Sequence, residues 1–357
     1  MKVGEDLNGY VVVTKPTNDG AGKCLWAFAE KDGREYFVKE FLDPKRPRPE
    51  SMGDPAAKRQ LMAQCEAFER RHRSVIRRLD PADLDAGNLV TALEFFCRGT
   101  RYYKITRRLY PVNQDPYTLE PAGKKVLLGT LLDSIVLLHR LGIVHSDLKP
   151  QNILLHQPAG SDLVTAKVID FDDSYVAGSP PDPQEIGGDA RYAAPEWIRY
   201  AAGDSSTGSK DMTTAADLFA LGLIVHQYLT GALPTYGAAH ASPAEAVNAG
   251  ERPVLDPRLD RQVAALLRRS LDRVPSVRPA ASQLRRELGD QRLFRLAELD
   301  TRAPTAGRSR IRYGPSGDRP LEPAPRPANP PPGAPARPSR VRINLGDRVR
   351  ADGRTGS

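Results

Sequence analysis

The sequence predicts an α+β fold of two lobes, a small strand-rich lobe at about 7–110 and a larger, mostly helical lobe at about 111–297. The first part consists of short β-branched and aromatic segments separated by turn residues. One long helical pattern interrupts these segments, and apolar residues at helical spacing dominate the second part. With 357 residues, the chain is long enough for one large domain of this kind.

The strand-rich lobe begins with GYVVVTK, residues 9–15, which is typical of a strand. Two further strands, KCLWAFAEK and REYFVKEF, meet at a hairpin signal at residues 31–33. Residues 56–79 carry apolar side chains every three or four positions, which predicts a helix. NLVTALEFFCRG and RYYKITRRLY then predict a second pair of strands.

The helical lobe begins with the apolar segment KKVLLGTLLDSIVLLHRLG, which predicts a helix ending at Gly142. A polar loop and the short strands NILL and AKVIDF follow, and an irregular stretch then covers residues 172–196. Further helices are predicted at 217–228, 260–270 and 281–288.

Residues 301–357 have a different composition, with 11 prolines, 12 arginines and only 4 acidic residues. This tail carries the whole formal net charge of +8, so residues 1–300 are neutral. Its proline runs favour polyproline II, and we expect no packed fold. Three roles remain open: a solvated linker, a docking segment for an SH3-like partner, or an arginine-rich binder of an anionic partner such as nucleic acid.

Cysteine usage and hydropathy indicate the compartment. Cys24, Cys65 and Cys97 are odd in number and far apart, which excludes a disulfide framework and a cysteine zinc site, and we expect buried thiols. No segment has the roughly 18 apolar residues of a membrane helix. The first ten residues also lack the apolar region of a secretory signal. We therefore expect a cytoplasmic protein without a membrane partner.

Polar residues gather between the long apolar helix and the strand NILL. Phosphoryl transfer from ATP needs a carboxylate near the attacking hydroxyl, oxygen ligands for Mg²⁺, and cations on the phosphates. Asp147 suits the first task, and Lys149 can neutralise the moving phosphoryl group. Asn152 and Asp170 suit the second, because Mg²⁺ prefers hard oxygen donors. Lys39, on the strand YFVKEF, can hold the α- and β-phosphates.

Six segments resemble motifs of the eukaryotic-like, or Hanks-type, Ser/Thr protein kinases, in the family's order along the chain. FVKEF resembles the V-A-I-K strand, VHSDLKPQN the H-R-D-x-K-x-x-N catalytic loop, IDFD the D-F-G element and AAPE the A-P-E element. DLFALG resembles the segment whose Asp217 braces the catalytic loop, and Arg278 of SVRP is placed to pair with Glu196. The likeness covers about residues 7–297 and implies one kinase domain at 1–300, followed by the tail.

The resemblance implies an enzyme that uses ATP and Mg²⁺ to phosphorylate proteins, itself included, with Asp147 and Lys149 as catalytic residues. Asn152 and Asp170 would bind Mg²⁺, and Lys39 would position ATP. It implies four further nucleotide-site positions. Gly20 and Gly22 would cover the phosphates, although an ordinary hairpin turn is the alternative because the loop lacks three spaced glycines. Thr106 would be the gatekeeper before a hinge at 107–109. Glu69, in preference to Glu66, would pair with Lys39.

The chain departs from the family pattern at three positions, with Ser146 for Arg, Asp172 for Gly and Asp189 for Thr. The missing Arg would otherwise bind a phosphorylated loop residue. We therefore expect a kinase whose switching does not depend on that Arg, similar to a bacterial subgroup that includes kinases of stress and phage-defence gene sets. The alternative is a pseudokinase scaffold that binds nucleotide and a partner without transfer. A small-molecule kinase is disfavoured by Glu196 and Arg278.

Overall fold

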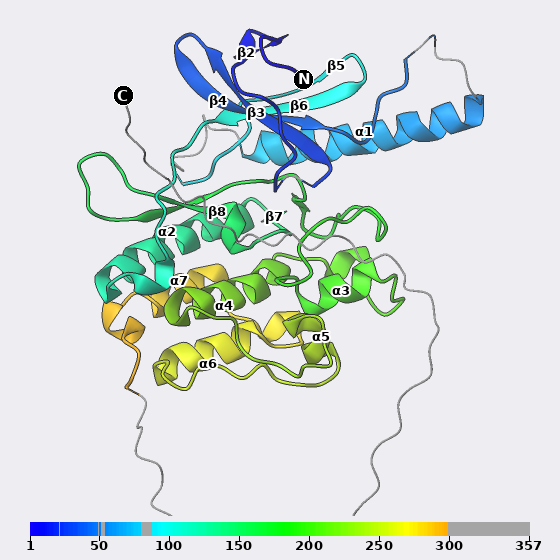
Figure 1. Ribbon diagram of the computed structural model, residues 1–357. Coiled ribbons are helices and arrows are strands. Elements are labelled where there is room, and N and C mark those ends of the chain that lie inside the picture. Colours follow the sequence, from blue (N-terminus) through cyan, green and yellow to red (C-terminus); the bar gives the residue numbers. More distant parts are fainter. Residues whose placement is uncertain (21, 49, 51–53, 80–87, 299–357) are drawn as a thin grey trace, which may run out of the picture. The chain divides into compact units, whose positions relative to one another are not determined.

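The computed structural model describes residues 1–20, 22–48, 50, 54–79 and 88–298. These residues form two lobes, with the strand-rich one above the helical one in Figure 1, and the expected two-lobed α+β fold is confirmed. The proline- and arginine-rich tail, with its three candidate roles, lies outside the described residues. None of the described helices is long and apolar enough to cross a membrane.

One antiparallel sheet of six strands forms most of the upper lobe, in the order β1-β2-β3-β4-β6-β5. The strands are β1 (Asp6–Leu7), β2 (Tyr10–Val12), β3 (Cys24–Lys31), β4 (Arg34–Phe41), β5 (Glu94–Arg98) and β6 (Arg101–Arg107). The expected hairpin joins β3 to β4, with Lys31 opposite Arg34. Asp32 and Gly33 both have positive φ, as a two-residue hairpin turn requires.

The long helix α1 (Pro55–Arg78) lies along this sheet (Figure 1). It begins where the sequence predicts, because the Asp54 side chain accepts hydrogen bonds from the amides of Ala56 and Ala57 and Pro55 occupies the first turn. Aromatic rings fill the space between helix and sheet. The ring of Phe68 on α1 lies 5.1 Å from that of Phe41 on β4.

The cysteines follow the expectation at two of three positions. Cys24 and Cys65 are buried, and burial raises the pKa of the Cys24 thiol to about 12. Cys97 is half-buried, so the expectation is wrong there. The reason is that β5 is the edge strand of the sheet and has a neighbour on one side only.

The lower lobe packs around two apolar helices, α2 (Pro121–Arg140) and α4 (Ala215–Thr230). Its other helices are α3 (Pro195–Ala201), α5 (Pro243–Asn248), α6 (Arg261–Ser270) and α7 (Ala281–Glu287). The sequence did not predict α3 and α5, because helices of 7 and 6 residues are too short to show a period. Gly231 ends α4 in the left-handed conformation, with φ of +85°.

Two small two-stranded sheets at the top of the lower lobe position the loops that face the sheet of the upper lobe. They pair β10 (Tyr175–Val176) with β7 (Ile143–Val144), and β8 (Ile153–His156) with β9 (Thr165–Val168). The amide of Ile169 donates to the carbonyl of Asn152 over 3.0 Å. The end of the loop before β8 and the start of the loop after β9 therefore lie side by side.

A buried ion pair ties α3 to the segment before α7. Two nitrogens of Arg278 donate to the two carboxylate oxygens of Glu196, each over 2.7 Å, and the Arg278 side chain also donates to the carbonyl of Ala215. Both charged side chains are almost completely buried. The pair expected from AAPE and SVRP therefore forms.

Replacing Arg278 by Met should lower the free energy of unfolding by about 3–5 kcal/mol, because it leaves a carboxylate buried without its cation. Urea unfolding measures this. Arg285→Met is the matched control, since Arg285 pairs with Asp133 at the surface, where the side chains are 40% and 54% exposed. That change should cost under about 1 kcal/mol. Equal losses in the two variants would contradict a structural role for the buried pair.

Candidate active site

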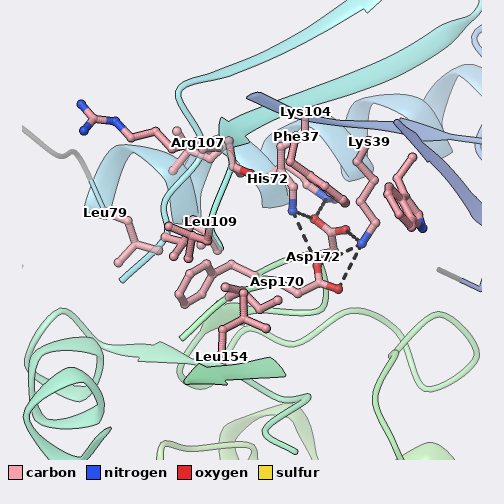
Figure 2. A pocket seen from close by; sticks show the side chains of 18 of the residues that line it. Phe37, Lys39, His72, Leu79, Lys104, Arg107, Leu109, Leu154, Asp170 and Asp172 are labelled. Carbon is pink, nitrogen blue, oxygen red and sulfur yellow. Dashed lines mark hydrogen bonds and ion pairs between the residues drawn. The ribbon is translucent and has the colours of Figure 1, made fainter. Parts of the chain in front are cut away.

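A pocket of about 290 Å³ lies between the sheet of the upper lobe and the loops of the lower lobe (Figure 2). Trp26, Phe28 and Phe37 of β3 and β4 line one side, and the rings of Trp26 and Phe37 stack with centroids 5.5 Å apart. Leu154 and Ile169 line the other side. Apolar walls with polar groups at one end are typical of a small-molecule site.

The chain that connects the lobes forms the edge of this pocket. Thr106, at the end of β6, lines it, and so do Arg107 and Leu109 of the expected hinge. The guanidinium of Arg108 lies 3.7 Å from the centroid of the Phe28 ring and donates a hydrogen bond to Glu35 over 2.8 Å. The gatekeeper and hinge positions implied by the resemblance therefore lie against the pocket.

Two lysines and two aspartates close the polar end of the pocket (Figure 2). The ammonium of Lys39 lies 3.0 Å from a carboxylate oxygen of Asp170 and 2.6 Å from one of Asp172. Lys104, opposite Lys39 in the β4–β6 register, donates to Asp172 and lies 3.6 Å from Asp170. Each ammonium therefore contacts both carboxylates.

These contacts favour the charged forms of Asp172 and Lys39. Burial alone would raise the pKa of Asp172, but the ammonium groups of Lys104 and Lys39 hold it well below its usual value. Burial alone would lower the pKa of Lys39, but Asp172 and Asp170 raise it well above its usual value. Nearby His72 is different, because burial lowers its pKa to about 3 and the imidazole is neutral.

The expected pair between Lys39 and Glu69 is wrong. Glu69 accepts a hydrogen bond from Arg46 over 2.7 Å and another from the Tyr102 hydroxyl over 2.7 Å. The alternative, Glu66, is also elsewhere, because its side chain is 60% exposed beside Arg70.

The face that α1 turns to the pocket explains this result. That face presents His72, Val75 and Ile76, none of which is a carboxylate. The aromatic packing of Phe68 against Phe41 and Tyr102 sets this rotation of the helix. Sequence reasoning missed Asp172 and Lys104 as partners of Lys39, although Asp172 stood out as a charged residue where the family has Gly.

The two predicted catalytic residues and the predicted Mg²⁺ ligand Asn152 meet in the loop before β8. Lys149 lies 2.8 Å from one carboxylate oxygen of Asp147 and 3.0 Å from the other. The side-chain amide of Asn152 donates to a carboxylate oxygen and to the backbone carbonyl of Asp147, each over 2.8 Å. Charge-assisted contacts from both sides therefore hold the orientation of this carboxylate.

The buried carboxylate of Asp217 supports the same loop through hydrogen bonds. Asp217 accepts hydrogen bonds from the amides of His145 and Ser146 over 2.9 and 3.1 Å, and it also contacts His139. The brace expected from DLFALG is therefore present. The His145 ring reaches the carbonyl of Ile169 over 3.0 Å, which links the loop to the strand end that carries Asp170.

The segment before α3 approaches the loop closely at Ser146. The hydroxyl of Ser146 accepts from the indole of Trp197 over 3.3 Å. Gly188 has φ of +141°, and a Cβ there would lie 2.8 Å from the Ser146 carbonyl oxygen. Asp189 lies 3.9 Å from Lys149.

Another carboxyl group beside the site, that of Asp173, is partly buried. Burial raises its pKa to about 7, and the neighbouring carboxylates of Asp147 and Asp172 contribute.

Gly20 and Gly22 lie in the loop between β2 and β3, both with positive φ. Neither is among the described residues that line the pocket. Their role over the phosphates stays a prediction, and the conformation is equally that of an ordinary turn.

Comparison with known proteins reveals related sequences. A family model described as protein kinase domain matches residues 20–287. The serine/threonine-protein kinase pkn3 of Myxococcus xanthus is 27% identical over 226 residues, which cover 59% of this chain and 38% of pkn3. The serine/threonine-protein kinase PkaA of Streptomyces coelicolor is 25% identical over 78% of this chain and 49% of its own length. A probable myosin light chain kinase of Dictyostelium discoideum is 27% identical, with 62% and 63% covered. The chain thus spans less than two thirds of each relative.

Replacing Asp217 by Asn should loosen the loop that carries Asp147, because each carboxylate oxygen accepts from one backbone N–H group and the amide has an NH2 group in place of one of these oxygens. We expect faster hydrogen exchange at residues 145–148 and a loss of about 1–3 kcal/mol of stability. Exchange measured by mass spectrometry tests this. In the control Asp204→Asn, which changes an acceptor in a surface turn, exchange at 145–148 should stay at the wild-type rate. Unchanged exchange in Asp217→Asn would exclude the brace.

Proposed function

Since this chain belongs to the protein kinase domain family, we propose that it is a Ser/Thr protein kinase that transfers the γ-phosphoryl group of ATP to hydroxyl groups of proteins, itself included. One observation carries the proposal most of all. The Asp147 carboxylate lies between Lys149 and Asn152, on the loop whose end is hydrogen-bonded to the residue before Asp170. This is the set of groups that phosphoryl transfer requires.

Asp147 would orient the attacking hydroxyl and accept its proton. The amide of Asn152 and the ammonium of Lys149 hold the carboxylate in one orientation, so a hydroxyl has a fixed acceptor. Lys149 lies within 3.0 Å of the carboxylate and can also neutralise charge on the transferring group.

The residues present also fit Mg²⁺. The Asn152 amide nitrogen is engaged by Asp147, which leaves the amide oxygen available for a cation. Asp170, which follows the residue whose amide donates to the Asn152 carbonyl, would supply a carboxylate. Magnesium typically takes one or two protein oxygens and completes its shell with phosphates and water. Bound Mg²⁺ would neutralise charge on the nucleotide phosphates.

The pocket would hold the nucleotide base between the ring of Phe37 and Leu154, against the backbone of residues 107–109. Thr106 would limit the depth that the base can reach. Lys39, at the polar end, would meet the phosphates, and Gly20 and Gly22 would cover them.

We propose further that this kinase is not switched through a phosphate bound to a catalytic-loop Arg. In its place, Ser146 bonds to Trp197, and Gly188 packs against the Ser146 carbonyl. The hydroxyl of Ser174 also donates to the carbonyl of His145 over 3.1 Å. These uncharged contacts, made by residues between 174 and 197, would hold this part of the chain against the loop without any modification.

Three finer hypotheses come from the sequence alone. They are a cytoplasmic location, a role in bacterial stress or phage-defence signalling, and an SH3-like or anionic partner for residues 301–357. The organisms of two relatives, Myxococcus xanthus and Streptomyces coelicolor, agree with a bacterial setting.

Incubation with Mg²⁺ and γ-labelled ATP tests the activity. Wild-type protein should label Ser or Thr in itself or in an added protein, whereas Asp147→Asn should reduce the rate by about 10²–10⁴-fold. Asp170→Ala should abolish Mg²⁺-dependent labelling, and the surface variant Asp204→Asn should match the wild type. Absence of label in a wild type that binds ADP, with candidate partners present, would favour the pseudokinase scaffold.

Phosphatase-treated protein should start labelling without a lag if loop order needs no phosphate. Gly188→Ala should lower the rate by about tenfold or more, because the new methyl group meets a backbone carbonyl at 2.8 Å. Gly178→Ala is the control, since that glycine also has positive φ but open space around it. A lag that disappears after autophosphorylation would contradict this hypothesis.

A further inference from the structure

The polar end of the pocket contains more charged groups than ATP binding by Lys39 and Asp170 explains. Asp172 and Lys104 are both largely buried there, with side chains 14% and 9% exposed. They come from separate elements, the loop after β9 and the strand β6, and the Asp172 carboxylate lies between the ammonium groups of Lys104 and Lys39 (Figure 2). Burying two additional charges is costly unless they act on each other and on their neighbours.

We propose that Asp172 and Lys104 are a positioning pair for Lys39. Asp172 fixes the Lys39 ammonium toward the nucleotide phosphates, which is the task that the sequence assigned to Glu69. Lys104 balances the charge that Asp172 brings. This inference rests on the proposed function, because it concerns how the same site holds ATP.

The geometry supports the role of Asp172. One of its carboxylate oxygens lies 2.6 Å from the Lys39 ammonium, and the other accepts from Lys104. On the face of α1 that lines the pocket, the neutral imidazole of His72 lies 4.0 Å from Asp172. Among the described residues, the carboxylates paired with Lys39 are therefore those of Asp170 and Asp172.

Charge balance explains why Lys104 accompanies Asp172. The formal charges of the two lysines and the two aspartates sum to zero. If the Asp170 carboxylate were committed to a metal ion, Asp172 would cancel the charge of Lys39 among the groups that remain. Lys104 restores one net positive charge at the point where the phosphates arrive. The β4–β6 register makes this arrangement available, because it places Lys39 and Lys104 directly opposite each other.

The two single variants, Lys104→Met and Asp172→Asn, and the double variant should therefore change ADP affinity and kcat in different ways. Lys104→Met should weaken ADP binding by at least about 5-fold, since one positive charge close to the phosphates is lost. Asp172→Asn should bind ADP at least as tightly as the wild type, because a negative charge close to the phosphates is lost, and it should lower kcat by about 10- to 100-fold, because Lys39 loses its anchor. The double variant should bind ADP within about 2-fold of the wild type, because the loss of one positive charge and the loss of one negative charge offset each other.

Calorimetry with ADP and with adenosine, beside kcat and KM for ATP, distinguishes positioning from a structural role. Adenosine lacks phosphates, so its affinity should stay within about 2-fold in all three variants. The matched controls are Lys124→Met, at a buried lysine of α2, and Asp256→Asn, at an acid paired with Arg258. Neither control should change the ratio of ADP to adenosine affinity.

The inference is overturned if all three variants keep the wild-type ratio of ADP to adenosine affinity and the wild-type kcat, whatever their stability. It is also overturned if wild-type protein binds no ADP. A wild type that binds ADP but transfers no phosphate contradicts the proposed function alone. In that case the inference is tested by ADP binding: the affinity should fall in Lys104→Met and recover in the double variant.

Discussion

The buried carboxylate of Asp217 holds together the parts on which the site depends. It accepts from the amides of His145 and Ser146 and contacts His139, so one side chain of α4 joins the end of α2 to the loop that carries Asp147. Buried backbone N–H groups need an acceptor, and a loop cannot supply one from a regular ladder. The orientation of Asp147 between Lys149 and Asn152 follows from this support.

The charged side chains at the junction of the lobes pair mainly with one another. Lys39 and Lys104 find their counter-charges in Asp170 and Asp172, within one cluster. Ser146, where the family has Arg, accepts a hydrogen bond from the indole of Trp197. Two departures from the family pattern thus act in the same direction. At both positions, Asp172 and Ser146, the contacts are made by side chains of this chain and lie close to the predicted catalytic residues.

Much of the fold could be predicted because it depends on local patterns. The period of residues 56–79 predicted α1, and the turn residues at 31–33 predicted the β3–β4 hairpin. The pairing of Glu196 with Arg278 was also expected, from the family resemblance. The short helices α3 and α5 were missed, and only residues 94–98 of the expected strand around 88–99 are β-strand. Short elements carry too little periodicity to be recognised.

The sequence by itself determined the element order, the family and the gathering of Asp147, Lys149 and Asn152, because these residues are close along the chain and lie on one loop. Only the tertiary structure decided the partner of Lys39. Helical spacing left both Glu66 and Glu69 open. The packing of Phe68 against Phe41 and Tyr102 then turned α1 so that neither carboxylate reached the pocket. Asp172 pairs with Lys39 because the loop after β9 enters the pocket beside Lys104. Asp172 and Lys104 are 68 residues apart in the sequence, so no local pattern predicts that they lie close together.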